Sequence, residues 1–343
     1  MTRGRLLALS LAMLALLVLL AGTSSVHAQA PAATGRVSGT ITSATAGFTV
    51  PDSVQLRLIA FDGPKIAETI VVPVASGKYT ATPAIVAGRT LVPHLTYEGV
   101  DYLGEPIALT ETVREATRDF SIYAVTRETP QLAIASTTLT VIAIDRKRGQ
   151  LGLLREDQVA NPSDRVYIGD DQRVTLRIPA ATGTIEAAGD NTDGTFVFER
   201  GVVTTTVPLR PGKLTSIVTR YVVGYDPNDD TYALRVTSPL PTERVKLRVP
   251  EGYAREIKPE SGARAGEDER LTGNEGAVLR VVQSTGSVRP GGGVVAQLRG
   301  LSTPIVQINP LTEPKGAAIA MALALTIIGG GAALAWRRLG RTT

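Results

Sequence analysis

The stretch Val245–Val249 reads Val-Lys-Leu-Arg-Val, so apolar and polar side chains alternate from one residue to the next. Successive side chains of a β-strand point to opposite faces, and this pattern is typical of a strand with one buried and one solvated face. Similar strand-like runs occur at Val54–Ile59, Thr175–Ile178 and Val278–Val282. Because no stretch between the two hydrophobic ends has a sustained apolar stripe at helical spacing, we predict an all-β fold with little helix.

Turn-forming residues separate the strand-like runs. They include Asp62-Gly63-Pro64, Ser76-Gly77, Asn161-Pro162-Ser163-Asp164, Asp193-Gly194 and Arg210-Pro211-Gly212. Short strands with turns at such spacing favour antiparallel β-sandwiches. The chain is long enough for two such domains, and Pro130 lies at a boundary between them. We therefore predict one sandwich at 35–127 and a larger one at 131–310.

The N-terminal residues have the pattern of a secretory signal peptide. Arg3 and Arg5 precede an apolar run from Leu6 to Ala21, and small residues frame a cleavage site at Val26-His27-Ala28. A basic start, a short apolar run and a small-residue site are the three parts of such a leader. We predict a signal peptide at 1–28. An uncleaved membrane anchor is the alternative, although the run is shorter than a full span needs.

The C-terminal residues predict a membrane anchor. Ala317–Trp336 contains no charged residue and is followed by Arg337, Arg338 and Arg341. Such a run is long enough to cross a bilayer, and flanking arginines favour the cytoplasmic side. We predict a transmembrane helix at 317–336, a basic cytoplasmic tail at 337–343 and a single-pass cell-membrane protein whose N-terminal body lies outside. The lipid bilayer is then one partner.

Charge and composition exclude several functions. The chain has a formal net charge of +4, and five arginines of its two ends account for that excess, because removing them leaves −1 for the body. Nucleic-acid binding therefore lacks an electrostatic basis. The local cluster Arg146-Lys147-Arg148 ends at Gly149 and predicts a solvated hairpin turn. With no cysteine there is no disulfide and no thiolate chemistry.

The first unit resembles a known family. It opens with Gly35-Arg36-Val37-Ser38-Gly39-Thr40-Ile41 and continues with Gly77-Lys78-Tyr79 and the strand-like run Thr90–Tyr97. This order resembles the carboxypeptidase regulatory-like domains, which are transthyretin-like sandwiches related in architecture to immunoglobulin domains. One difference is Thr49–Val54, where the family usually has a small-residue turn. The resemblance implies a non-catalytic accessory or binding module.

The second unit has a weaker resemblance. Asp164–Gly169, Thr175–Pro179, Leu209–Gly212 and Val218–Tyr225 together resemble the β-rich, membrane-anchored regions of uncharacterised bacterial envelope proteins. This analogy supplies no chemistry. The polar stretch Glu260–Glu275 is predicted to be a loop.

A search for catalytic motifs finds none. The sequence has no nucleophile elbow, metal-binding His-Glu helix, phosphate loop or dinucleotide fingerprint. His27 belongs to the predicted leader, so a histidine-based triad would need His94, which lies in a strand-like run and is interpreted as structural. We expect no enzyme activity, no catalytic residues and no cofactor.

One acidic segment has the spacing with which a calcium loop begins. Asp226, Asn228 and Asp230 occupy alternate positions, as the first oxygen ligands of such a loop do. Thr231 then replaces the required glycine and Thr237 the required glutamate. This segment and Gly189–Gly194 are better explained as hairpin tips, so no metal site is assigned.

These observations favour a non-catalytic, membrane-anchored, extracytoplasmic β-sandwich protein that serves as a binding or structural component of a prokaryotic cell envelope. Its partner would be an envelope protein or a glycan. One alternative is an accessory subunit of a membrane complex for electron transfer or secretion. A hydrolase acting on surface glycan or peptide is a further alternative.

Overall fold

The computed structural model describes residues 33–260, 262–270 and 278–301. All regular structure in these ranges is β-strand, which confirms the predicted all-β class. Within the same ranges, no helix has the length and apolar character needed to cross a membrane. The predicted signal peptide, the membrane helix at 317–336 and the tail at 337–343 lie outside the described residues, as does the end of the second predicted domain.

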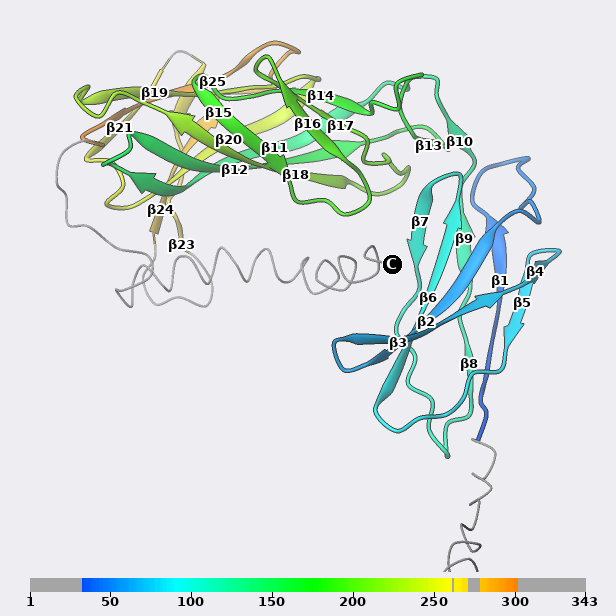
Figure 1. Cartoon of the computed structure of the whole chain (residues 1–343). Coiled ribbons are helices and arrows are strands. Elements are labelled where there is room, and N and C mark those ends of the chain that lie inside the picture. The colour runs from blue at the N-terminus through cyan, green and yellow to red at the C-terminus, as the bar shows by residue number, and fades with distance from the viewer. Residues whose placement is uncertain (1–32, 261, 271–277, 302–343) are drawn as a thin grey trace, which may run out of the picture.

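The first part of the chain forms an N-terminal lobe, which comprises β1 to β9 (Figure 1). Its strands are β1 (Arg36–Ser43), β2 (Gln55–Asp62), β3 (Lys65–Val72), β4 (Val74–Ala75), β5 (Lys78–Ala81), β6 (Arg89–Tyr97), β7 (Val100–Leu103), β8 (Glu115–Thr117) and β9 (Phe120–Ile122). One sheet has the order β4-β5-β1-β8, with β9 also pairing with β1, and the other has the order β3-β2-β6-β7.

The core of the N-terminal lobe lies between these two sheets. Val37 and Ile41 of β1 pack with Leu56 and Leu58 of β2 and with Leu95 of β6, and all five are buried. The alternation of side chains along a strand explains why these residues are buried, because the intervening residues of each strand face outward. The two sheets are therefore held together by side chains that the period-two pattern selects.

Gly39 has a steric role in this lobe. It lies opposite Tyr79 on β5, and the Tyr79 hydroxyl donates to the carbonyl of Arg118. A Cβ atom on Gly39 would lie 1.8 Å from that carbonyl oxygen. Only glycine therefore allows the segment before β9 to approach β1 this closely.

The rest of the chain forms a larger C-terminal lobe, and a short two-stranded ladder of β10 (Val125–Thr126) with β13 (Val166–Tyr167) lies between the lobes (Figure 1). The strands of the C-terminal lobe are β11 (Ala133–Asp145), β12 (Gln150–Ala160), β14 (Leu176–Pro179), β15 (Thr184–Gly189), β16 (Phe196–Glu199), β17 (Val202–Thr205), β18 (Thr215–Gly224), β19 (Thr231–Thr237), β20 (Thr242–Pro250), β21 (Glu256–Pro259), β22 (Ala263–Ala265), β23 (Glu269–Arg270), β24 (Val278–Ser284) and β25 (Gly293–Arg299).

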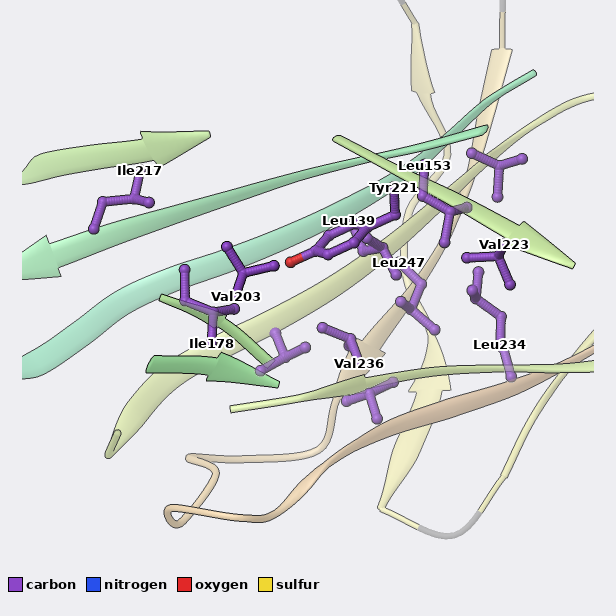
Figure 2. Close-up of a cluster of buried hydrophobic side chains, with 14 of the residues drawn as sticks. Leu139, Leu153, Ile178, Val203, Ile217, Tyr221, Val223, Leu234, Val236 and Leu247 are labelled. Atoms are coloured by element: carbon purple, nitrogen blue, oxygen red, sulfur yellow. The ribbon is translucent and has the colours of Figure 1, made fainter. Parts of the chain in front are cut away.

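Three sheets surround the core of the C-terminal lobe. The large sheet has the order β15-β18-β12-β11-β20-β24-β22, with β23 also pairing with β24, and the small sheets have the orders β14-β17-β16 and β19-β25-β21. Figure 2 shows Leu153 and Tyr221 of the large sheet with Ile178 of one small sheet and Leu234 and Val236 of the other. The large sheet therefore forms one layer, and both small sheets contribute to the opposite side of the core.

The structure confirms several predicted strands and turns. The runs quoted above overlap β2, β14, β20 and β24, although Val54 and Thr175 each precede their strand by one residue. Arg146-Lys147-Arg148 form the turn of the β11–β12 hairpin, where Gly149 has a φ of 63°. Ser76 and Gly77 both have positive φ between β4 and β5, as a tight hairpin turn requires.

Three expectations were wrong. The sheets are mixed, because β1 pairs in parallel with β8 and β9, and β11 pairs in parallel with β20. The acidic segments are not hairpin tips: β18 and β19 lie in different sheets, as do β15 and β16. Part of the polar stretch Glu260–Glu275 forms β22 and β23 on β24. Alternation selects a buried face but does not specify the neighbouring strand, so the sequence left strand pairing undetermined.

Candidate functional site

Charged and polar groups from distant segments of the chain meet at the joint between the two lobes. Arg210 follows β17 in the C-terminal lobe, and its Nη2 donates to the carbonyl oxygen of Asp101 in the N-terminal lobe at 2.8 Å. Its Nη1 lies 3.1 Å from Oδ2 of Asp193 in its own lobe. The guanidinium carbon is 5.8 Å from the centroid of the Tyr102 ring, within the range of a cation–π contact. One side chain therefore contacts both lobes.

Tyr102 is held from two sides. Its hydroxyl accepts a hydrogen bond from the Tyr123 N–H at 3.3 Å, and Arg210 lies over its ring. Burial raises the pKa of the Tyr102 phenol, although the Tyr123 N–H and the charge of Arg210 partly oppose this. The phenol is therefore neutral near pH 7, and its ring presents an electron-rich face to Arg210.

A second group of contacts surrounds Thr45. Its Oγ1 donates to the carbonyl of Asp164 in the C-terminal lobe at 2.5 Å and accepts from the Ala124 N–H at 3.0 Å. The adjacent β10–β13 ladder extends this attachment, because the Val166 N–H donates to the Ala124 carbonyl at 2.9 Å. These contacts join the end of β1, the interlobe segment and the loop before β13.

His94 lies on β6, and its partner is a carboxylate on β7. Its Nε2 is 3.0 Å from Oδ1 of Asp101, which also accepts from Thr96 Oγ1 at 2.9 Å. Among the described residues, the hydrogen bonds of His94 include no serine or threonine hydroxyl. Asp101 therefore orients the imidazole ring.

The three residues of the candidate calcium loop lie in the connection between β18 and β19. Asp226 Oδ1 accepts from the N–H and the Nδ2 of Asn228 at 2.9 and 3.1 Å. Asp230 Oδ2 lies 3.1 Å from Arg255 Nη2. Across the described ranges, no three His, Cys, Asp or Glu side chains gather in a way that could hold a metal ion. The carboxylates of Asp226 and Asp230 therefore have partners within the protein.

Two sets of polar contacts were not predicted from the sequence. Arg210 was interpreted only as part of a turn, and nothing local in Arg210-Pro211-Gly212 identifies a contact with the other lobe. Arg155 and Asp157 are buried in the core of the C-terminal lobe, with exposed side-chain fractions of 2% and 0%. A signal for this pair was present, because both residues fall in phase with the inward-facing Leu151, Leu153 and Val159 of β12.

Comparison with known proteins gives no family. No family model matches the chain, and no curated protein matches it. Among solved structures, an M1 zinc metallopeptidase from Deinococcus radiodurans bound to a Tyr-Ser-Ala substrate aligns with 51% of this chain and 44% of its own, at 14% identity and a TM-score of 0.32. The full-length major pilin SpaD from Corynebacterium diphtheriae aligns with 77% of this chain and 81% of its own, at 10% identity and a TM-score of 0.21.

The chain thus spans less than half of the peptidase that it matches. Both TM-scores are too low to carry an argument about fold family or activity.

Proposed function

We propose that this protein is a non-catalytic, membrane-anchored, extracytoplasmic component of a prokaryotic cell envelope, which holds its N-terminal lobe away from the bilayer as a binding or structural module. The observation that carries the proposal is that the chain enters the N-terminal lobe and leaves the C-terminal lobe at points far from the joint. The described residues begin at the end of one lobe and finish at the end of the other, with the joint between them.

The course of β1 supports this arrangement in the N-terminal lobe. Arg36 at its start bonds to the Arg114 carbonyl, whereas Ala44, just after its end, bonds to the Ile122 carbonyl next to the joint. The eight residues of β1 span about 26 Å at about 3.3 Å per residue. The chain therefore enters the lobe far from the joint.

The course of β12 and β25 supports it in the C-terminal lobe. β12 ends at Ala160, beside the joint, and starts at Gln150, opposite Gly224 of β18. The chain leaves β25 at Arg299, opposite Thr231, and the Gly300 N–H bonds to the Asp230 carbonyl. The turn Asp226–Asp230 links β18 to β19, so the exit lies at the end of β12 that is distant from the joint. A helix at 317–336 would then anchor this end.

We further propose that the N-terminal lobe is a carboxypeptidase regulatory-like, transthyretin-like sandwich and that the C-terminal lobe is a sandwich of related architecture. The packing of side chains between opposed sheets supports both assignments. The close approach at Gly39 gives a physical reason for the second glycine of the opening motif. Domains of the carboxypeptidase regulatory-like family are accessory or binding modules. We therefore propose a non-catalytic role for the N-terminal lobe.

A role as an accessory subunit of a membrane complex is the second candidate. Ile185 on β15 and Val197 on β16 are 59% and 50% exposed, and both strands are at the edges of their sheets. Exposed apolar side chains on sheet edges favour association with another protein.

Protease treatment of intact cells tests the main proposal. The full chain carries a short epitope after Thr343, and an external protease is added before and after the membrane is permeabilised. We expect nearly the whole chain to be degraded in intact cells while a small C-terminal fragment with the epitope survives. A cytoplasmic protein serves as control. Protection of the full-length chain in intact cells would overturn the topology, and co-purification of one stoichiometric membrane complex would favour the accessory-subunit role.

A further inference from the structure

The two lobes share no buried hydrophobic cluster among the described residues. The core of the N-terminal lobe and the core of the C-terminal lobe are separate sets of side chains. Domains joined without a large apolar interface are expected to move relative to one another. The angle between these lobes therefore depends on the contacts at the joint, which include the polar contacts described above.

Those contacts fall at two separate points. The first combines Thr45, Ala124 and the β10–β13 ladder, which bring the end of β1 and the loop before β13 onto the interlobe segment. A single attachment of this kind allows rotation about itself. The second point is Arg210, which reaches β7, in the other sheet of the N-terminal lobe from β1. Attachments to both sheets of the N-terminal lobe restrict a rotation that one attachment would permit.

Within the C-terminal lobe, Asn161 connects the two points. Its Nδ2 donates both to the Arg165 carbonyl and to the Leu209 carbonyl, each at 2.8 Å. Asn161 is 4% exposed. The loop that precedes β13 and the loop that carries Arg210 are therefore tied to one side chain, and Asp193 holds the guanidinium from its own lobe.

We propose that Arg210 is a latch that fixes the angle between the lobes, with Thr45 and the β10–β13 ladder as the hinge. Closed, the guanidinium binds the Asp101 carbonyl and the Tyr102 ring. Open, both lobes keep their own cores and the N-terminal lobe swings about the hinge. The latch is a conformational device that sets where the N-terminal lobe points, and it operates whether or not the chain is anchored in a membrane.

Spin-label distances on the full chain in detergent test the latch. The chain has no cysteine, so Lys78→Cys in one lobe and Asn228→Cys in the other provide two unique labelling sites on exposed residues. We expect a narrow distance distribution for the otherwise unchanged chain. We expect Arg210→Ala to at least double its width, while the far-ultraviolet circular dichroism stays the same.

Two further variants separate the latch from a folding defect. Tyr102→Leu removes the ring under Arg210 without altering the C-terminal lobe and is expected to broaden the distribution less than Arg210→Ala does. Arg177→Ala is the matched control, because Arg177 pairs with Asp170 within the C-terminal lobe and does not contact the joint.

An equally narrow distribution in Arg210→Ala, or equal broadening in Arg177→Ala, would overturn the proposal. A distribution that is already broad in the unchanged chain would overturn it as well. If Arg210→Ala does not fold, the result for Tyr102→Leu decides, because broadening supports the latch and an unchanged width contradicts it.

Discussion

Arg155 and Asp157, two residues apart on β12, form a two-point ion pair inside the C-terminal lobe. Arg155 Nε lies 2.7 Å from Asp157 Oδ2, and Nη2 lies 3.1 Å from Oδ1. Thr137 Oγ1 donates to the same carboxylate at 2.6 Å, and Arg155 Nη1 donates to the Pro179 carbonyl on β14 at 3.0 Å. Burial acts to lower the pKa of Arg155, but the charge of Asp157, the hydrogen bonds to it and the neighbouring Tyr221 together outweigh burial and raise that pKa. The Arg155 guanidinium is therefore charged, and its contacts connect the large sheet to a small one.

Removing one member of this pair is expected to be costly. Asp157→Ala leaves the Arg155 charge buried without its partner, so the free energy of unfolding should fall by about 3–5 kcal/mol. Arg177→Ala breaks an exposed pair with Asp170 and should cost about 0–1 kcal/mol. Urea unfolding measures both. The double change Arg155→Met with Asp157→Leu should recover most of the loss, and a double variant no more stable than Asp157→Ala would contradict this account.

Gly39 provides a steric test. Gly39→Ala would bring a methyl group against the Arg118 carbonyl, and forcing an atom into a packed region costs about 1–3 kcal/mol or more. Gly286→Ala is the matched control, because no atom lies within 4 Å of its would-be Cβ. It should be neutral or stabilising by about 0.4–1 kcal/mol. Thermal melts of the two variants should shift in different directions or by clearly different amounts; equal melting temperatures would show that the backbone near Arg118 yields easily.

The raised pKa values of two buried tyrosines predict that the folded state loses stability at alkaline pH. Burial raises the pKa of Tyr79 to about 12, with Asp119 adding to the rise and Arg118 opposing it. Burial also raises the pKa of Tyr232 to about 12. The folded chain keeps both phenols protonated where the unfolded chain loses the protons. The contribution of the two protonated phenols to the free energy of unfolding is therefore complete below about pH 10. It is lost progressively as the pH rises from about 10 to about 12.

Urea unfolding over this pH range, with phenolate absorbance recorded in parallel, measures the effect. Tyr232→Phe should reduce the slope of stability against pH. Tyr123→Phe removes one tyrosine while retaining both buried phenols and serves as control. A slope that is the same in both variants would show that Tyr232 ionises at the same pH in the folded and unfolded chains.

Calcium is expected to leave stability unchanged. Asp226 and Asp230 are already bonded to Asn228 and Arg255. A bound ion at a hundredfold excess over its dissociation constant would add about 2.7 kcal/mol. Melts in millimolar calcium and in chelator should therefore coincide. A rise of several degrees that disappears in Asp226→Ala or Asp230→Ala would instead establish a calcium site.

Local sequence patterns predicted the all-β class, the position of several strands and the hairpin at Arg146-Lys147-Arg148. These features depend on local chemistry: alternation selects the buried face of a strand, as in Val245–Val249, and glycines such as Gly149 permit the backbone angles of a turn. A few neighbouring residues are enough to specify each of them.

The pairing of strands, the contacts between the two lobes and the burial of polar residues depend on tertiary contacts. β11 pairs in parallel with β20, about a hundred residues later, and alternation carries no information about that choice. Arg210 meets Asp101 across 109 positions, while Arg155 is a buried charge only because Asp157 and Pro179 surround it. Such contacts depend on the three-dimensional convergence of distant segments, so no local pattern in the sequence records them.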